Sequence, residues 1–266
     1  MALWRMLGQP ELVREPRFDD LFYPGDKASL AALVDQGLCA APANARAIIV
    51  PHSDLRLVAE VVGAGFARLA SARRIVILGP SHKIPFAGVA VPNADGWRTP
   101  LAMSRIDIKA FKSLEPLQIV RVIDAVFDAE PAVELLIPWA QTTHPGALLI
   151  GILTGDVGSG ELRQLFSALD DGDTVFVVAS ELGRDLGERE LVGQDEATLG
   201  QLGRLNARGL TSDHLTARSA VAALLDHASD RGWAPERVLH RTSRELGAPD
   251  ERTAGFAAVA FAPAAP

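Results

Sequence analysis

Short runs of consecutive apolar residues recur along this chain and alternate with longer segments in which apolar positions repeat at helical spacing. Within several of the short runs, neighbouring residues are all apolar rather than alternately apolar and polar. That pattern is typical of strands covered by helices on both faces of a sheet. We therefore expect buried strands at Ala47–Val50, Arg74–Leu78, Gly88–Val91, Ala147–Leu153, Thr174–Ala179 and Gly255–Phe261.

The segments between these runs carry apolar stripes typical of amphipathic helices. The clearest spans 213–231, where Ser212 can cap the first turn and Gly232 can end the last. The other helices are expected at Lys27–Gln36, Leu55–Ala70, Ile106–Ser113, Ala132–Gln141, Glu161–Leu169 and Glu196–Asn206. Alternation of strands and helices predicts an α/β fold, built as a three-layer helix–sheet–helix sandwich with a central mixed sheet. Since no linker or repeat interrupts the pattern, we expect one domain over residues 1–266.

Composition narrows the classes of partner. The formal net charge of −7 argues against nonspecific nucleic-acid binding, which needs a basic face. No stretch approaches the roughly 18 to 20 apolar residues that span a bilayer, and charged residues, Gly8 and Pro10 break the amino-terminal segment. The single Cys39 excludes an intrachain disulfide. We expect a cytoplasmic protein with a small-molecule partner and neither nucleic-acid nor membrane partners; a homo-oligomer stays open.

Two histidines follow buried strands directly. His52 comes after Ala47–Val50, and His82 comes after Arg74–Leu78 through a Gly-Pro-Ser lead-in. In open α/β sheets, ligands collect where the chain leaves the carboxyl ends of the strands. A third strand ends in Ser180-Glu181, which would add a carboxylate. Two imidazoles and one carboxylate form the ligand set of non-haem iron enzymes and also suit zinc.

Other polar residues leave alternatives open. Asp54 could orient the imidazole of His52, but we favour its role as the cap of the following helix. Glu130 and Glu134, four residues apart, could place paired carboxylates in the site or on the solvent face. The chain has no GxxxxGK[ST], GxSxG or HExxH motif. Structural or solvent-exposed roles are expected for His144, His214, His227 and His240.

Taken in order, these phrases resemble the Memo family, whose fold is related to the metal-dependent class III extradiol dioxygenases. The resemblance runs over nearly the whole chain. It is carried by FYPGD at 22–26, IVPH ending at His52, LGPSH ending at His82, GWRTPL at 96–101, the Glu130, Glu134 and Pro138-Trp139 segment, VVASELG around Glu181, and GFAAVAF near the carboxyl terminus. The resemblance implies the same layered fold and a metal site at the two histidines.

The chain also departs from the family pattern. PHSDL stands where the family has PHAGY, and Glu130-Pro131-Ala132 stands where it has EHS. In place of SDLSH the chain reads Ser180-Glu181-Leu182-Gly183-Arg184, so the histidine resembling the dioxygenases' acid/base residue is Arg184. Arginine stays protonated and serves poorly as a base, but it can bind an anion or stabilise an oxyanion.

The resemblance places the family's third metal ligand near 242–246, at Glu245 or Leu246, with Glu181 as the competing carboxylate. We therefore expect a dioxygenase-like metalloprotein that oxidises or cleaves a small molecule, with His52, His82 and Glu245 or Glu181 holding Fe(II), and zinc or copper as other candidates. Two alternatives are a non-catalytic Memo-like protein that binds a ligand or partner, and a metal-assisted hydrolase.

Overall fold

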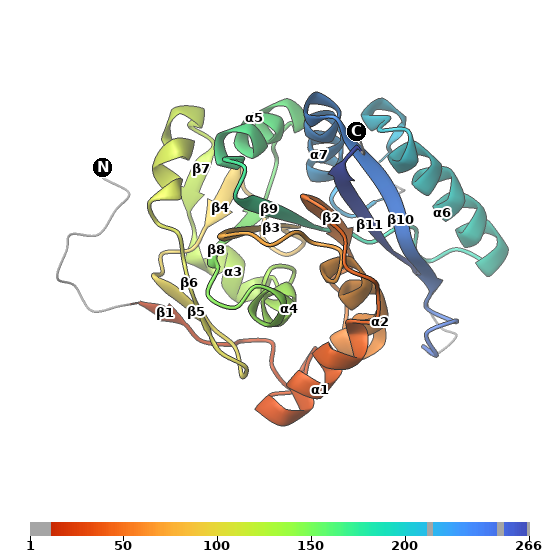
Figure 1. The fold of residues 1–266 in the computed structure, drawn as a ribbon, viewed down its shortest axis with the longest axis horizontal. Coiled ribbons are helices and arrows are strands. Elements are labelled where there is room, and N and C mark those ends of the chain that lie inside the picture. The colour runs from red at the N-terminus through yellow and green to blue at the C-terminus, as the bar shows by residue number, and fades with distance from the viewer. Residues whose placement is uncertain (1–11, 212–214, 249–252, 265–266) are drawn as a thin grey trace.

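An eight-stranded mixed sheet forms the centre of the molecule in a computed structural model that describes residues 12–211, 215–248 and 253–264 (Figure 1). The strand order is β10-β11-β2-β9-β3-β8-β4-β7. β2, β9, β3 and β8 run parallel to one another, whereas β11 and β4 pair antiparallel at either side of this group. The bounds are Ala47–Val50 (β2), Arg74–Pro80 (β3), Val89–Val91 (β4), Val120–Val122 (β7), Leu148–Thr154 (β8), Thr174–Ala179 (β9), Trp233–Thr242 (β10) and Gly255–Pro263 (β11).

Helices cover both faces of this sheet, and the predicted helix–sheet–helix sandwich with a mixed sheet is confirmed. One face carries α1, α2 and α4, and the other carries α5, α6 and α7 (Figure 1). A small sheet of β1, β5 and β6 lies beside the main one. The bounds are Lys27–Gly37 (α1), Leu55–Phe66 (α2), Asp124–Ala129 (α3), Ile137–Thr143 (α4), Ser159–Leu169 (α5), Glu188–Gly203 (α6), Arg218–Arg231 (α7), Val13–Arg14 (β1), Gly96–Arg98 (β5) and Met103–Arg105 (β6).

Several predicted helices have different limits, each for a local reason. The helix predicted at 106–113 is absent; a 3-10 helix at Ala110–Leu117, which contains Pro116, overlaps only its second half. Helix α6 begins eight residues before its predicted start because its buried positions, such as Leu191 and Asp195, are too few and too polar to show a stripe. Helix α7 begins at Arg218 and ends at Arg231, and Gly232 follows it in the left-handed conformation, as predicted for this end. The proposed Ser212 cap lies outside the described residues.

Glu130 and Glu134 do not share a helix face. Glu130 follows the last residue of α3 in an extended conformation, whereas Glu134 is the first residue of the short 3-10 helix at Glu134–Leu136. Both are buried, so neither lies on the solvent face. The Glu134 Oε1 atom accepts hydrogen bonds from the amides of Arg17 and Phe18 at 2.9 Å and from the Tyr23 hydroxyl at 2.7 Å. Burial, the largest influence, raises the pKa of Glu134 above its ordinary value. This carboxylate fastens the amino-terminal segment to the core.

Replacing Tyr23 by phenylalanine should lower the free energy of unfolding by about 1 kcal/mol, since it removes one buried hydrogen bond and leaves Glu134 two other donors. Urea unfolding followed by circular dichroism measures this. An unfolding midpoint unchanged from that of the unmodified protein would show that the hydroxyl contributes nothing to the anchor.

Candidate functional site

The candidate site lies at the carboxyl ends of the parallel strands. His52 follows β2, His82 follows β3, and Glu181 follows β9, which pairs with both of those strands. In the sheet, β9 lies between β2 and β3, although in the chain it comes after both β3 and β8. The connection from β2 to β3 therefore runs along the sheet in one direction, and the connection from β8 to β9 runs in the opposite direction. This reversal of direction creates the crevice in which open α/β sheets bind ligands. The structure thus brings together the three side chains that the sequence placed after buried strands.

The two imidazole rings stack on each other. Their centroids are 5.3 Å apart and the ring planes differ by 14°. His52 is buried, and its Nδ1 atom has no hydrogen-bond partner among the described residues. Glu181 Oε1 lies 3.8 Å from this nitrogen, which is beyond hydrogen-bond distance. Burial, the dominant influence, lowers the pKa of His52 although Glu181 opposes the shift, so the ring is neutral near pH 7.

The Glu130 carboxylate contacts both the backbone and the ring of His82. The Glu130 Oε2 atom accepts the backbone amide of His82 at 2.7 Å and lies 3.1 Å from its Nδ1 atom. Burial raises the pKa of Glu130, but these bonds outweigh it and leave the pKa below its ordinary value. A carboxylate on one ring nitrogen fixes the imidazole and directs the other nitrogen outward, which is the usual support of a metal-bound histidine.

The Glu181 carboxylate is already occupied by two other groups. Its Oε1 atom accepts the Ser53 hydroxyl at 2.5 Å, and its Oε2 atom lies 3.4 Å from the Arg184 guanidinium. Thr216 fixes its backbone, because the Thr216 hydroxyl accepts the Glu181 amide at 3.0 Å. As arranged, no group of three or more His, Cys, Asp or Glu side chains within the described residues is placed to hold a metal ion.

Glu245 and Leu246, the other candidates for the third ligand, lie in a turn after β10. The Glu245 carboxylate is exposed and accepts the backbone amide of Thr242 at 2.7 Å, a bond that lowers the pKa of Glu245. Leu246 packs against the core. The contacts of Glu245 are therefore those of a local turn, while Glu181 is the carboxylate beside His52.

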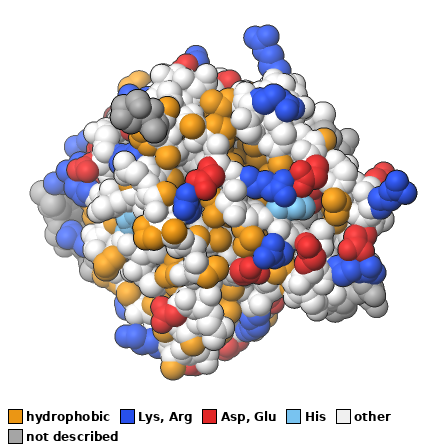
Figure 2. All heavy atoms as spheres, turned by 45° about the vertical axis from the view of Figure 1, so that its right-hand side comes forward, with side chains coloured by type: hydrophobic (Ala, Val, Ile, Leu, Met, Phe, Trp, Pro, Cys, Tyr) orange, Lys and Arg blue, Asp and Glu red, His pale blue; other side chains and the backbone are white. Residues whose placement is uncertain are grey.

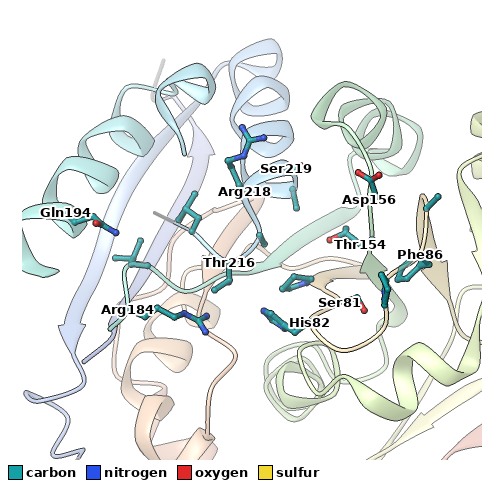
Figure 3. A pocket seen from close by; sticks show the side chains of 18 of the residues that line it. Ser81, His82, Phe86, Thr154, Asp156, Arg184, Gln194, Thr216, Arg218 and Ser219 are labelled. Atoms are coloured by element: carbon teal, nitrogen blue, oxygen red, sulfur yellow. The ribbon is translucent and has the colours of Figure 1, made fainter. Parts of the chain in front are cut away.

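A cavity of about 1000 Å³ opens in front of His82. Figure 3 shows His82 and Arg184 pointing toward each other across it, with Thr216 close by. Arg218 and Ser219, at the start of α7, and Asp156, after β8, line its outer part (Figure 3). Apolar side chains complete the wall: Pro85, Phe86, Leu182, Leu186 and Leu215. Its volume is that of a small-molecule site.

A family model described as Memo-like protein matches residues 14–213, which is most of the chain and includes His52, His82 and Glu181. The chain belongs to the Memo family. A MEMO1 family protein of Aquifex aeolicus is 24% identical over 207 residues, covering 74% of this chain and 77% of that protein. Protein MEMO1 of Homo sapiens is 32% identical over 148 residues, so the match spans 52% of this chain and 50% of the human protein. A crystal structure of an uncharacterized Escherichia coli K12 protein superposes with a TM-score of 0.49 at 13% identity, covering 82% and 99% of the two chains.

The predicted roles of Asp54 and of the other histidines can now be compared with the structure of this Memo-family protein. Asp54 caps α2, because its carboxylate accepts the amide of Arg56 at 2.9 Å, as favoured from the sequence. Three of the other histidines make structural contacts: His144 with the Ala70 carbonyl, His227 with Asp170, and His240 with Asp195. His214 lies outside the described residues.

Asp195 is a residue near the site that sequence reasoning missed. Its side chain is fully buried; Oδ1 accepts the amide of Gly183 at 3.0 Å, and Oδ2 lies 2.9 Å from His240 Nε2. It thereby fixes the loop that carries Glu181 and Arg184. An acidic residue within a polar helix gives no sequence signal for such a position, because its partners come from distant segments.

The surface of this Memo-family protein carries charges of both signs. Acidic and basic side chains are interleaved on the face shown in Figure 2, and exposed pairs include Arg237–Glu196 at 2.8 Å. Within the described ranges, none of the helices combines the length and apolarity that a membrane crossing requires.

Proposed function

We propose that this Memo-family protein binds a divalent metal ion through His52, His82 and Glu181 and acts on a small anionic molecule in the adjoining cavity. Fe(II) is the first candidate, with zinc and copper as alternatives, and the proposed reaction is a dioxygenase-like oxidation or ring cleavage. The proposal rests on one arrangement above all: two stacked imidazoles with Glu130 behind His82 and Glu181 beside the unpartnered nitrogen of His52.

Two features support a metal ion at this donor set, and a third requires Glu181 to change its contacts. His52 Nδ1 is a buried polar atom that lacks a partner, which is unusual in a folded protein. Glu130 gives His82 the support that metal-bound histidines have. Glu181 would supply the carboxylate, after exchanging its present contacts with Ser53 and Arg184. When bound, the metal would supply a Lewis acid and, as iron, a redox centre.

The other residues would bind and orient the substrate. Arg184 is half exposed in the cavity and faces His82, so its guanidinium would hold an anionic group of the substrate beside the histidines (Figure 3). The apolar wall would cover the remainder of the molecule and exclude water. Arg184 would not act as a general base, since its guanidinium stays protonated.

The same arginine favours a second candidate function, a protein that binds its ligand without turnover. A guanidinium stands where the resemblance implies an acid/base histidine, and it is paired with Glu181. The third candidate function is metal-assisted hydrolysis, and the identity of the bound metal distinguishes it from oxidation. Bound zinc without oxygen consumption would favour hydrolysis, whereas bound iron with oxygen uptake would favour oxidation.

The test compares the two candidate carboxylates as matched variants. After purification without chelators and anaerobic reconstitution with Fe(II), metal analysis of the unmodified protein should find one metal ion per chain. His52→Ala, His82→Ala and Glu181→Gln should lose at least tenfold in metal affinity, the size of effect expected for a lost ligand or its support. Glu245→Gln should retain the metal, because the Glu245 carboxylate accepts its hydrogen bond from Thr242 within the same turn.

Equal metal content in the unmodified protein and in His82→Ala would overturn the proposal. Loss of metal in Glu245→Gln but not in Glu181→Gln would transfer the third ligand to Glu245. Oxygen uptake with catechol-type substrates, abolished in His82→Ala, would separate the oxidation from binding without turnover.

A further inference from the structure

We propose that Arg184 couples ligand binding to metal binding, so that a small carboxylate with an apolar body raises the affinity of this site for a divalent metal. This inference rests on the proposed function and names the class of molecule that the cavity takes. Its basis is that Ser53, Arg184 and the proposed metal ion compete for the Glu181 carboxylate.

The first observation is that Glu181 is held away from His52. Its Oε1 atom lies 3.8 Å from His52 Nδ1 but 2.5 Å from the Ser53 hydroxyl, and its Oε2 atom faces the Arg184 guanidinium at 3.4 Å. An unpaired polar atom in the interior is unfavourable. His52 Nδ1 therefore has no partner among the described residues while Glu181 bonds to Ser53 and Arg184.

The second observation is that Arg184 can change partners. Half of its side chain is exposed, it lines the cavity, and only one of its nitrogens lies close to Glu181. A guanidinium binds a carboxylate best through two parallel hydrogen bonds. A free carboxylate in the cavity can form such a pair, whereas Glu181 does not. A carboxylate ligand would therefore replace Glu181 at Arg184.

The third observation concerns the rest of the cavity. Phe86, Leu182 and Leu186 provide an apolar wall, which suits an apolar body attached to the charged group. A second cation, Arg218, lines the outer part of the cavity and has no ion-pair partner among the described residues. Figure 3 shows Arg184, but not Arg218, pointing toward His82.

The consequence is a positive coupling between two ligands. Once a carboxylate binds Arg184, Glu181 no longer has to give up its ion pair with this cation to reach a metal at His52 and His82. The metal and the carboxylate must then raise each other's affinity by the same factor, because binding free energies are linked.

Calorimetric titration with Zn²⁺, which is redox-inactive, tests this in the full chain, with benzoate as the carboxylate and benzyl alcohol as its neutral counterpart. Benzoate should raise the Zn²⁺ affinity about five- to tenfold, at the lower end of typical coupling factors. Benzyl alcohol should leave it unchanged. Conversely, Zn²⁺ should raise the benzoate affinity by the same factor as benzoate raises that of Zn²⁺.

Two arginine variants separate competition for Glu181 from general charge repulsion. Arg184→Leu should bind Zn²⁺ about five- to tenfold more tightly than the unmodified protein without benzoate, and benzoate should have no further effect. Arg218→Leu removes an equal charge from the same cavity but leaves the Glu181 pair intact, so its response to benzoate should match that of the unmodified protein. Far-ultraviolet circular dichroism of both variants confirms that they are folded.

The outcomes are distinct. Zn²⁺ binding that is insensitive to benzoate, or weakened in Arg184→Leu, would overturn the coupling and leave the proposed metal site standing. Equal tightening in both arginine variants would reduce the effect to charge repulsion and also overturn it. If the unmodified protein binds no Zn²⁺ in either condition, the proposed function fails and the coupling fails with it.

Discussion

Replacing Gly63 by alanine should lower the free energy of unfolding by about 3 kcal/mol or abolish folding, because the added methyl group has no space. Gly63 lies in α2 against the last residue of α1. A Cβ atom there would lie 2.2 Å from the carbonyl carbon and oxygen of Gly37, and one on Gly37 would lie 2.4 Å from the Ala59 carbonyl and the Trp139 ring. These neighbours are backbone and a fully buried indole, so relief requires the two helices to separate.

Gly193 provides the matched control for this substitution. It lies inside α6, and a Cβ atom added to it would meet nothing within 4 Å. Gly193→Ala should therefore raise the free energy of unfolding by about 0.5–1 kcal/mol, since alanine favours a helix over glycine. Urea unfolding midpoints of the two variants should move in opposite directions. A shift of the same sign and size in both would contradict the close contact between α1 and α2.

Replacing Asp195 by alanine should cost about 3 kcal/mol of stability and also disturb the candidate site. The change removes the buried acceptor of the Gly183 amide and of His240, which belong to the site loop and to β10. The Asp195 carboxylate also packs directly against the backbone of Gly255. A Cβ atom on Gly255 would collide with Asp195 Oδ2, so the carboxylate fills the space that a side chain at position 255 would take.

Asp195→Asn separates the two contacts. Its amide oxygen can still accept from Gly183, so the loop carrying Glu181 and Arg184 should stay in place while the bond to His240 weakens. Urea unfolding measures the stability of each variant. The Zn²⁺ affinity measured by titration reports whether the loop still holds Glu181 in position. Asp195→Asn should keep the Zn²⁺ affinity that Asp195→Ala reduces. Unchanged stability in Asp195→Ala would refute the anchoring role.

The fold and the positions of three candidate site residues could be predicted because their signals are local. Continuous apolar runs identified the central strands, and His52, His82 and Glu181 follow those runs directly. β10 is harder to predict from the sequence because most of its residues are partly exposed and form no continuous apolar run. Since the turn containing Glu245 follows β10, the position of Glu245 relative to the histidines could not be predicted either. Asp195 and Thr216 act through contacts with distant segments, which no single stretch of sequence reveals.

The order of the strands has one more consequence. His52 and His82 stand at the ends of strands that β9 separates, and Glu181 arrives with β9 itself. No continuous piece of the chain holds the three side chains together, so a ligand that contacts all of them recognises only the fully paired sheet. Such a ligand at 100 times its dissociation constant would stabilise the native state by about 2.7 kcal/mol through mass action alone. Thermal-shift screening of metals and carboxylates would therefore use the whole fold as the sensor of what this site binds.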